Sequence, residues 1–256
     1  MRRSAIIVFS VLTVISTMLF SVISEDIVSI PAIIDVVSIE QRLKVELVEN
    51  ASTGYTWSYE VSDPSFLTLV SKETAESSVD TPVIAGSPST VTWLFSPNKS
   101  GSFSLVFRLF RAWEGEETAI DVRVYNVEVQ NSSLSECVPQ YVTILGSSSG
   151  EIEISQLARI VLQENPSTGY SWKAEVFDAA VLRPVERSLL TESDSHEATP
   201  IVELGGSQEV LGAPVNVAFD FQALKAGISL VRFTYSRPWE ESEQDKTLLV
   251  GIKVAR

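Results

Sequence analysis

The sequence has very few of the side chains that form disulfides, metal sites and thiol nucleophiles. Its 256 residues include a single cysteine, Cys137, and a single histidine, His196. One cysteine cannot form a disulfide within the chain, so the fold must be held by packing alone. No cluster of cysteine and histidine suggests a zinc site, and neither residue lies in a context that would activate a thiol. We interpret Cys137 as an incidental thiol, with a disulfide-linked dimer as the alternative.

Basic side chains are also scarce. The chain has 19 lysines and arginines against 33 acidic residues, and residues 1–24 contain two of the arginines and no acid. Without that segment the formal charge is −16, from 17 basic and 33 acidic side chains, leaving His196 uncounted. Because proteins bind nucleic acids through clustered lysine and arginine, this balance argues against a nucleic-acid partner. We attribute the acidic excess to solubility.

A long apolar run occurs only at the N-terminus, where Arg2 and Arg3 precede an uncharged stretch from Ala5 to Ile23. This pattern predicts a signal sequence at residues 1–24, cleaved before Glu25. An uncleaved anchor is the alternative, since about 19 residues nearly span a bilayer. Both interpretations place the rest of the chain outside the cytoplasm, secreted or extracytoplasmic, with no membrane contact beyond this segment.

One serine-rich segment, Gly146 to Gly150, formally matches the nucleophile elbow of serine hydrolases. That pattern requires a strand before the serine and a helix after it. Here the strand-like residues 151–154 follow, so we interpret the segment as a turn. We therefore expect no enzymatic activity and no cofactor.

The remaining chain repeats itself. Asn50-Ala51-Ser52-Thr53-Gly54-Tyr55 recurs as Asn165-Pro166-Ser167-Thr168-Gly169-Tyr170, Gly86-Ser-Pro as Gly212-Ala213-Pro214, and Arg111-Ala112-Trp113 as Arg237-Pro238-Trp239. From Gly86 to Trp113 is 27 residues, and from Gly212 to Trp239 is also 27. From the first motif to the middle one, however, Gly54 to Gly86 is 32 residues and Gly169 to Gly212 is 43, which indicates an insertion of 11 residues around 191–207 in the second copy. The repeat predicts two domains, residues 25–130 and 140–256, joined by a linker at 131–139.

Each copy has the alternation of short β-strands. Leu43, Val45 and Leu47 alternate with polar residues, and Leu105, Phe107 and Leu109 lie on one face. Ile120, Val122 and Val124 are matched with Leu248, Val250 and Ile252, and residues 97–101 and 223–227 are interpreted as hairpin connections. No segment after the signal has a helical period. An all-β fold of two tandem β-sandwiches follows.

The three ordered motifs resemble those of the chagasin family, over nearly the whole chain beyond residue 24 and in both copies. The resemblance implies immunoglobulin-like sandwiches with the motifs on three loops at one end. It also implies reversible inhibition of papain-like cysteine proteases, because the loops form a wedge that enters the active-site cleft. Ser52-Thr53 and Ser167-Thr168 would lie nearest the protease thiolate.

The residues themselves suit that role. Gly54 and Gly169 permit the positive φ of a tight turn, and Pro238 fixes the backbone beside Trp239. The predicted binding residues are, in the first domain, Asn50, Ser52, Thr53, Gly54, Tyr55, Gly86, Arg111 and Trp113, and, in the second, Asn165, Pro166, Ser167, Thr168, Gly169, Tyr170, Gly212, Ala213, Pro214, Arg237, Pro238 and Trp239. The alternative interpretation is purely structural, with Tyr170 and Trp172 in the core and Trp239 covering the sandwich end.

The first copy departs from the motifs at two positions, Ala51 and Ala112, where the second copy has proline. A freer loop loses more entropy on binding, so we expect the first domain to be the weaker inhibitor. Asn50, Asn98 and Asn131 begin N-glycosylation sequons, and a glycan on Asn50 would lie on the binding loop. We expect a monomer, and the alternative function is a non-inhibitory binding or adhesion module on the same fold.

Overall fold

The computed structural model describes residues 27–76, 88–131, 141–143, 146–154, 156–189, 214–242 and 245–256. The predicted signal sequence lies outside these ranges, as do Cys137, His196, the insertion around 191–207 and most of the linker. Within the described part of the chain no helix is long and apolar enough to cross a membrane.

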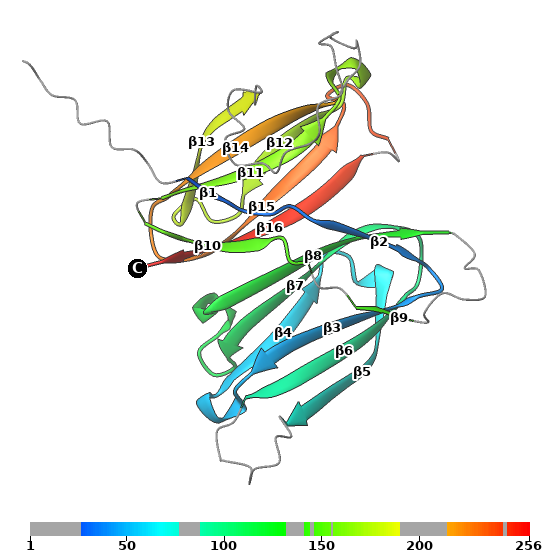
Figure 1. Ribbon diagram of the computed structural model, residues 1–256, viewed down its shortest axis with the longest axis vertical. Helices are drawn as coiled ribbons and strands as arrows, with labels where there is room; N and C mark the ends of the chain where they lie inside the picture. Colours follow the sequence, from blue (N-terminus) through cyan, green and yellow to red (C-terminus); the bar gives the residue numbers. More distant parts are fainter. Residues whose placement is uncertain are drawn as a thin grey trace, which may run out of the picture.

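Four sheets of four strands each make up two sandwiches, one above the other in Figure 1. In the first sandwich one sheet has the order β2 (Ile34–Ser38), β8 (Asp121–Gln130), β7 (Gly101–Arg111) and β4 (Tyr55–Val61). Its other sheet has the order β5 (Leu67–Glu76), β6 (Ser89–Pro97), β3 (Arg42–Glu49) and β9 (Tyr141–Thr143).

The second sandwich repeats this arrangement. One sheet has the order β10 (Ser149–Glu153), β16 (Lys246–Ala255), β15 (Gly227–Ser236) and β12 (Ser171–Val176). The other has the order β1 (Ile27–Ser29), β11 (Leu157–Glu164), β14 (Val215–Ala223) and β13 (Leu182–Leu189). The only described helices are single 3-10 turns, η1 (Ala51–Thr53), η2 (Pro64–Phe66), η3 (Glu116–Thr118) and η4 (Pro166–Thr168). The prediction of two tandem immunoglobulin-like β-sandwiches is confirmed.

Each sandwich has its own aromatic core, built by alternate residues of facing strands. Trp93, Phe95 and Phe107 are fully buried in the first, and Phe221 and Phe233 in the second. The rings meet largely edge to face, as for Trp93 on Phe107 at a centroid distance of 5.0 Å. The alternation of Leu43 and Val45 with polar neighbours therefore marked a true core face.

Two sequence interpretations are wrong in detail. Residues 97–101 and 223–227 are not hairpin connections, because β6 and β7, like β14 and β15, belong to opposite sheets of their sandwich. Alternation shows that a strand has a buried face but not whether the next strand pairs with it or packs across from it.

The proposed match of Val122 and Val124 with core residues of β16 is also wrong. Leu105 pairs with Tyr125 and its counterpart Val231 pairs with Val250, so Tyr125 corresponds to Val250. Val122 and Val124 instead pack with Val106, Leu230 and Leu249 in a third apolar cluster, between the two sandwiches.

The two sandwiches exchange their first edge strands. β1, at the start of the chain, pairs in parallel with β11 of the second sandwich, and β9 pairs in parallel with β3 of the first. Ile30 follows β1 and is buried in the core of the second sandwich, with its backbone N–H bonded to the Arg159 carbonyl at 2.9 Å. The predicted boundaries at 130 and 140 took no account of this exchange.

Buried polar groups hold the junction between the sandwiches together. The Asn126 side chain is 2% exposed; its Oδ1 accepts from Leu249 N at 2.8 Å, and its Nδ2 donates to Leu249 O at 3.0 Å. Asn126 Nδ2 also donates to Ser148 Oγ at 3.0 Å, and this hydroxyl accepts from Ile33 N at 2.8 Å. The serine-rich segment at 146–150 is therefore part of the junction. This structural role accounts for the serine Ser148 without a catalytic one.

Replacing Ile30 with alanine should destabilise the second sandwich, although Ile30 precedes the first in sequence. A buried isoleucine truncated to alanine costs about 2–5 kcal/mol through lost burial and the cavity left behind. We expect hydrogen exchange to speed up in β11 and β14. Val37→Ala is the matched control, because Val37 lies in the core of the first sandwich and should loosen β3 and β6 instead. Faster exchange in β3 and β6 of Ile30→Ala would contradict the strand exchange.

Candidate binding loops

The Ser-Thr-Gly motif of the second sandwich forms a closed turn between β11 and β12. Asn165 caps η4: its Oδ1 accepts from Ser167 N at 3.2 Å and from Ser167 Oγ at 2.6 Å. Thr168 Oγ1 donates to the Asn165 carbonyl at 2.7 Å. Gly169 ends the turn at φ +77°, the left-handed conformation for which glycine is suited. The sequence prediction of this turn and of its glycine is therefore confirmed.

The first sandwich builds the same turn without the proline. Asn50 Oδ1 accepts from Ser52 N at 3.2 Å and from Ser52 Oγ at 2.6 Å, while Thr53 Oγ1 donates to Asn50 O at 2.6 Å. Gly54 has φ +80°. The two turns therefore have matching internal hydrogen bonds. The proline at position 166 is not needed to form the turn, because the first sandwich forms it with alanine at position 51.

A tryptophan from the Arg-x-Trp motif covers each turn. Trp113 and Trp239 are 71% and 69% exposed, and each indole lies against the glycine of the neighbouring turn. A Cβ placed on Gly169 would lie 2.7 Å from Trp239 Cη2, and one on Gly54 would overlap the Trp113 ring. Glycine is thus needed for the close approach of the indole as well as for the backbone. The indoles lie on the sandwich ends and still expose most of their surface.

An arginine joins the two loops of each set. Arg111 Nε donates to the Thr53 carbonyl at 3.1 Å, and Arg237 Nε donates to the Thr168 carbonyl at 2.9 Å. Each guanidinium also stacks over the motif tyrosine, with Arg111 4.5 Å from the ring centre of Tyr55 and Arg237 4.6 Å from that of Tyr170. Two segments far apart in sequence are therefore fixed as one surface.

Sequence reasoning gave no role to the acidic residue after each tryptophan. Glu114 forms an ion pair with Arg111 at 3.0 Å, and Glu240 forms one with Arg237. The hydrogen bond that Arg111 donates to Glu114 raises the pKa of Arg111, and the one that Arg237 donates to Glu240 raises the pKa of Arg237. Each glutamate thereby fixes the guanidinium toward the threonine carbonyl. The signal was present, since the glutamate recurs in both copies of the motif.

A second missed pair of glutamates supports the base of each turn. Glu49 and Glu164 are buried; their carboxylates accept from Trp57 N at 2.9 Å and from Trp172 N at 3.2 Å. Arg187 pairs with Glu164 at 2.7 Å. Both acids directly precede the motif asparagine, so this repetition too was visible in the sequence.

The structure brings most predicted site residues together. In each sandwich the first and last motifs meet at one end, with the serine and threonine exposed at the tip. Tyr170 is buried and stacks on Tyr235 at 5.2 Å, so it supports the loop from below, as does Trp172. The middle-loop residues Gly86, Gly212 and Ala213 lie outside the described residues. Pro214 is described and exposed, next to Val215, which pairs with Glu164 at the loop end of β11.

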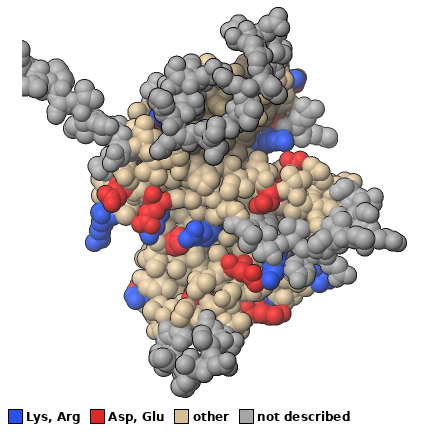
Figure 2. Space-filling view, in the orientation of Figure 1, with Lys and Arg blue, Asp and Glu red and all other residues tan. Residues whose placement is uncertain are grey.

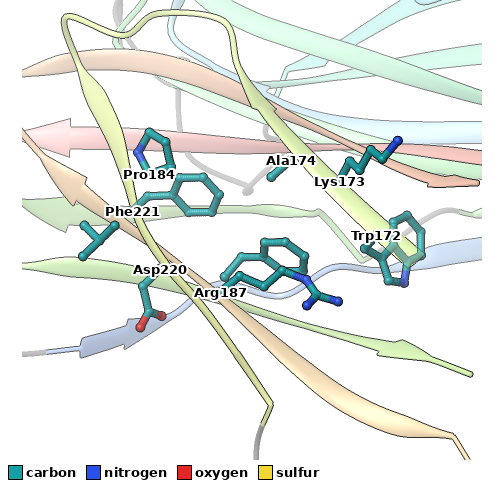
Figure 3. Close-up of a pocket in the computed structure, with 9 residues that line it drawn as sticks. Trp172, Lys173, Ala174, Pro184, Arg187, Asp220 and Phe221 are labelled. Carbon is teal, nitrogen blue, oxygen red and sulfur yellow. The ribbon is translucent and has the colours of Figure 1, made fainter. Parts of the chain in front are cut away.

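A hollow of about 510 Å³ also lies on the described part of the second sandwich. Figure 3 shows Trp172, Lys173 and Ala174 on one side and Pro184, Arg187, Asp220 and Phe221 on the other. Two of its charged groups are already engaged, Arg187 by Glu164 and Asp220 by Arg159 at 2.8 Å. A similar hollow of about 530 Å³ lies between β4 and β5 of the first sandwich. We interpret both as gaps between the edge strands of each sandwich.

The charged side chains of the described residues are spread over the surface and form no single large cluster on the face in Figure 2. Among these residues no group of histidine, cysteine and acidic side chains is placed to hold a metal ion. On the face in Figure 2, lysine and arginine side chains are dispersed among acidic ones instead of gathered in one basic patch. The loop sets offer exposed hydroxyls, backbone and an indole, which are groups for contact.

Gly169→Ala should disturb the loop set through two separable effects. A left-handed backbone costs a residue with a Cβ about 1–2 kcal/mol, and the methyl group must also displace the Trp239 indole. A double-mutant cycle with Trp239→Ala separates the two effects in the free energy of unfolding. We expect Gly169→Ala to cost less in the Trp239→Ala background. Equal costs in both backgrounds would show that the indole does not rest on the glycine.

Comparison with known proteins places both sandwiches in one family. Residues 36–129 and 151–254 match the model of the Chagasin family peptidase inhibitor I42. Amoebiasin-2 of Entamoeba histolytica is 30% identical over 105 residues, which is 41% of this chain and 75% of that protein.

Two solved structures are among those similar to the chain. The cysteine protease inhibitor EhICP2 from Entamoeba histolytica is 22% identical with a TM-score of 0.31, over 42% of this chain and 86% of that one. PbICP-C, solved in complex with falcipain-2, is 16% identical with a TM-score of 0.27, over 42% and 86%. Because the family model matches both sandwiches, this protein belongs to the chagasin family, whose members inhibit peptidases and are not enzymes.

Proposed function

We propose that this protein is a reversible inhibitor of papain-like cysteine endopeptidases, and that the loops at the end of each sandwich occlude the protease cleft. The observation that carries the proposal is the joining of the Ser-Thr-Gly turn to an exposed tryptophan by an arginine, in both sandwiches. Membership in a family of peptidase inhibitors supports it. The action is steric and needs no bond to be made or broken.

The closed turn is suited to entering a cleft without being cut. Ser167 and Thr168 present small hydroxyl side chains at its tip, and the backbone N–H of each residue is hydrogen-bonded to Asn165. A protease cleaves a peptide that lies extended through its active site, whereas these residues are wound into a 3-10 turn. Unwinding would break the cap and the Arg237 bond to Thr168, so the turn resists becoming a substrate.

The exposed tryptophan supplies the apolar contact area beside the cleft. Trp and Arg are common among the residues that carry most of the energy of a protein interface. Because each indole is already positioned by the glycine beneath it, little rotational freedom is lost on binding. We propose Trp113 and Trp239 as the anchors of the two sites.

The middle loop completes the proposed wedge. β6 begins at Ser89, opposite Glu49, and β14 begins at Val215, opposite Glu164. The chain that carries Gly86 and the chain that carries Gly212 and Ala213 therefore enter these strands at the loop end of each sandwich. We propose that they add a third contact there.

We further propose that the protein is exported and acts as a monomer outside the cytoplasm. The apolar segment at residues 1–24 motivates the location, and the acidic excess of the remaining chain suits a soluble protein. Its target is then a protease that shares that compartment.

Alanine at both tryptophans should abolish strong inhibition of papain by residues 25–256. An interface anchor is worth about 2 kcal/mol or more, so each Trp→Ala change should weaken its own site by about 30-fold. Inhibition is followed by hydrolysis of a fluorogenic peptide. Phe177→Ala is the control, because Phe177 is an exposed aromatic just after β12, at the far end from the loops. Undiminished inhibition by a folded double variant would reject the anchors, and wild-type protein that inhibits neither papain nor cathepsins would favour the non-inhibitory binding module.

Ala51→Pro should strengthen the first site. Ala51 is the first residue of η1, the position that Pro166 occupies in η4, and proline is tolerated at the first residue of a helix. A compatible proline removes about 0.4–1 kcal/mol of loop freedom, which corresponds to about two- to fivefold tighter inhibition. The effect is measured in the Trp239→Ala background, where the first site dominates. Bacterial expression keeps Asn50 free of glycan, and weaker inhibition would contradict the preorganisation argument.

A further inference from the structure

The two loop sets lie at opposite ends of the molecule. In Figure 1 the end of β3 and the start of β4, which flank the first turn, lie at the lower left. The end of β15 and the turn after β11 lie at the upper right, beyond the other sandwich. Figure 1 looks down the shortest axis, so the separation seen there is a true separation along the molecule.

This opposed orientation follows from an approximate two-fold relation between the sandwiches. β8 of one and β16 of the other pack together at the junction and run in opposite directions in Figure 1. The strand exchange is reciprocal in the same sense, since each sandwich receives a short parallel strand from the other half of the chain. A rotation of this kind turns the loop end of one sandwich away from that of the other.

The junction is built to keep this orientation. The apolar cluster of Val106, Val122, Val124, Leu230 and Leu249 lies between the sandwiches, and Asn126 is bonded to both the N–H and the carbonyl of Leu249. The backbone of Ser148 adds two hydrogen bonds. Its N–H donates to the Val124 carbonyl at 2.7 Å, and its carbonyl accepts from the Gly251 N–H at 2.9 Å. The exchanged strands β1 and β9 would have to leave their sheets before either sandwich could swing.

We infer that one chain binds two papain-like protease molecules at the same time, one at each end. This inference rests on the proposed function and adds its stoichiometry. Both turns have the same hydrogen bonds, the same positive φ at glycine and the same arginine bond, so both are formed before binding. Because they face away from each other, both sites cannot grip the same protease molecule, and a protease at one end leaves the other open.

The consequence is independent binding without chelation. Two linked sites raise avidity only when both can engage the same partner, and this geometry forbids that for a single protease molecule. The protein should instead bring two protease molecules together, and affinity at one end should not depend on occupancy of the other.

A two-step capture measures simultaneous binding directly. Papain is immobilised, residues 25–256 are bound to it, and free papain is then passed over the surface. We expect a second, equal molar amount of papain to be captured, and a ratio of two papain molecules per chain in a calorimetric titration. Capture of the chain followed by no second papain, with a ratio of one in solution, would overturn the inference and leave the proposed function standing. Failure of the first capture would count against the proposed function itself.

Two one-site variants serve as matched controls. Thr53→Arg with Trp113→Ala blocks the first loop set, and Thr168→Arg with Trp239→Ala blocks the second, because an arginine at the exposed tip is too large for a narrow cleft. Each variant should bind immobilised papain but capture no second molecule, at a ratio of one. Capture of a second papain by either variant would show that the bridging does not use both loop ends. Unchanged hydrogen exchange in β11 and β3 verifies the fold of each variant.

Discussion

The exchange of edge strands is the constraint on which the rest of the molecule depends. β1 completes a sheet of the second sandwich and β9 completes a sheet of the first, so one sheet of each sandwich takes its edge strand from the other half of the chain. Ile30 enters a core more than a hundred residues away in sequence, where Ile160 and Phe221 also lie. The junction around Asn126 and Ser148 then fixes the two sandwiches as a unit and fixes the direction in which each loop set faces.

Most of the fold within each sandwich could be predicted because it depends on local patterns. Alternation identified the core faces of β3 and β7, and the repeat placed both sets of loops. The exchange could not be predicted, since strands of three residues, such as β1 and β9, carry no periodic signal. The burial of Val106 and Val122 could not be predicted either. An apolar residue on the outer face of a strand interrupts the alternation of apolar and polar residues, and its role is clear only when a neighbouring sandwich covers it.

The site could be located from the sequence because its parts are short motifs in a fixed order. The contacts between these motifs could not be predicted from the sequence. The hydrogen bond from Arg237 to Thr168 spans 69 residues, and its acceptor is a backbone carbonyl. Glu114 and Glu240 were missed for a related reason: an exposed glutamate beside an exposed tryptophan has no evident function until its arginine partner is seen. Repetition of a polar residue at matched positions is the signal that would have marked them.

The intertwining of the two halves also bears on how such a protein survives among proteases. Residues 132–140 are the only covalent link between the segment ending in β8 and the segment beginning with β9, yet they are not what holds the sandwiches together. After a single cut there, β1 of the N-terminal fragment would still lie in a sheet of the C-terminal fragment. In the same way, β9 of the C-terminal fragment would still lie in a sheet of the N-terminal fragment. The nicked protein would persist as a two-chain complex with both ends intact, so damage to the linker need not release or separate the two sites.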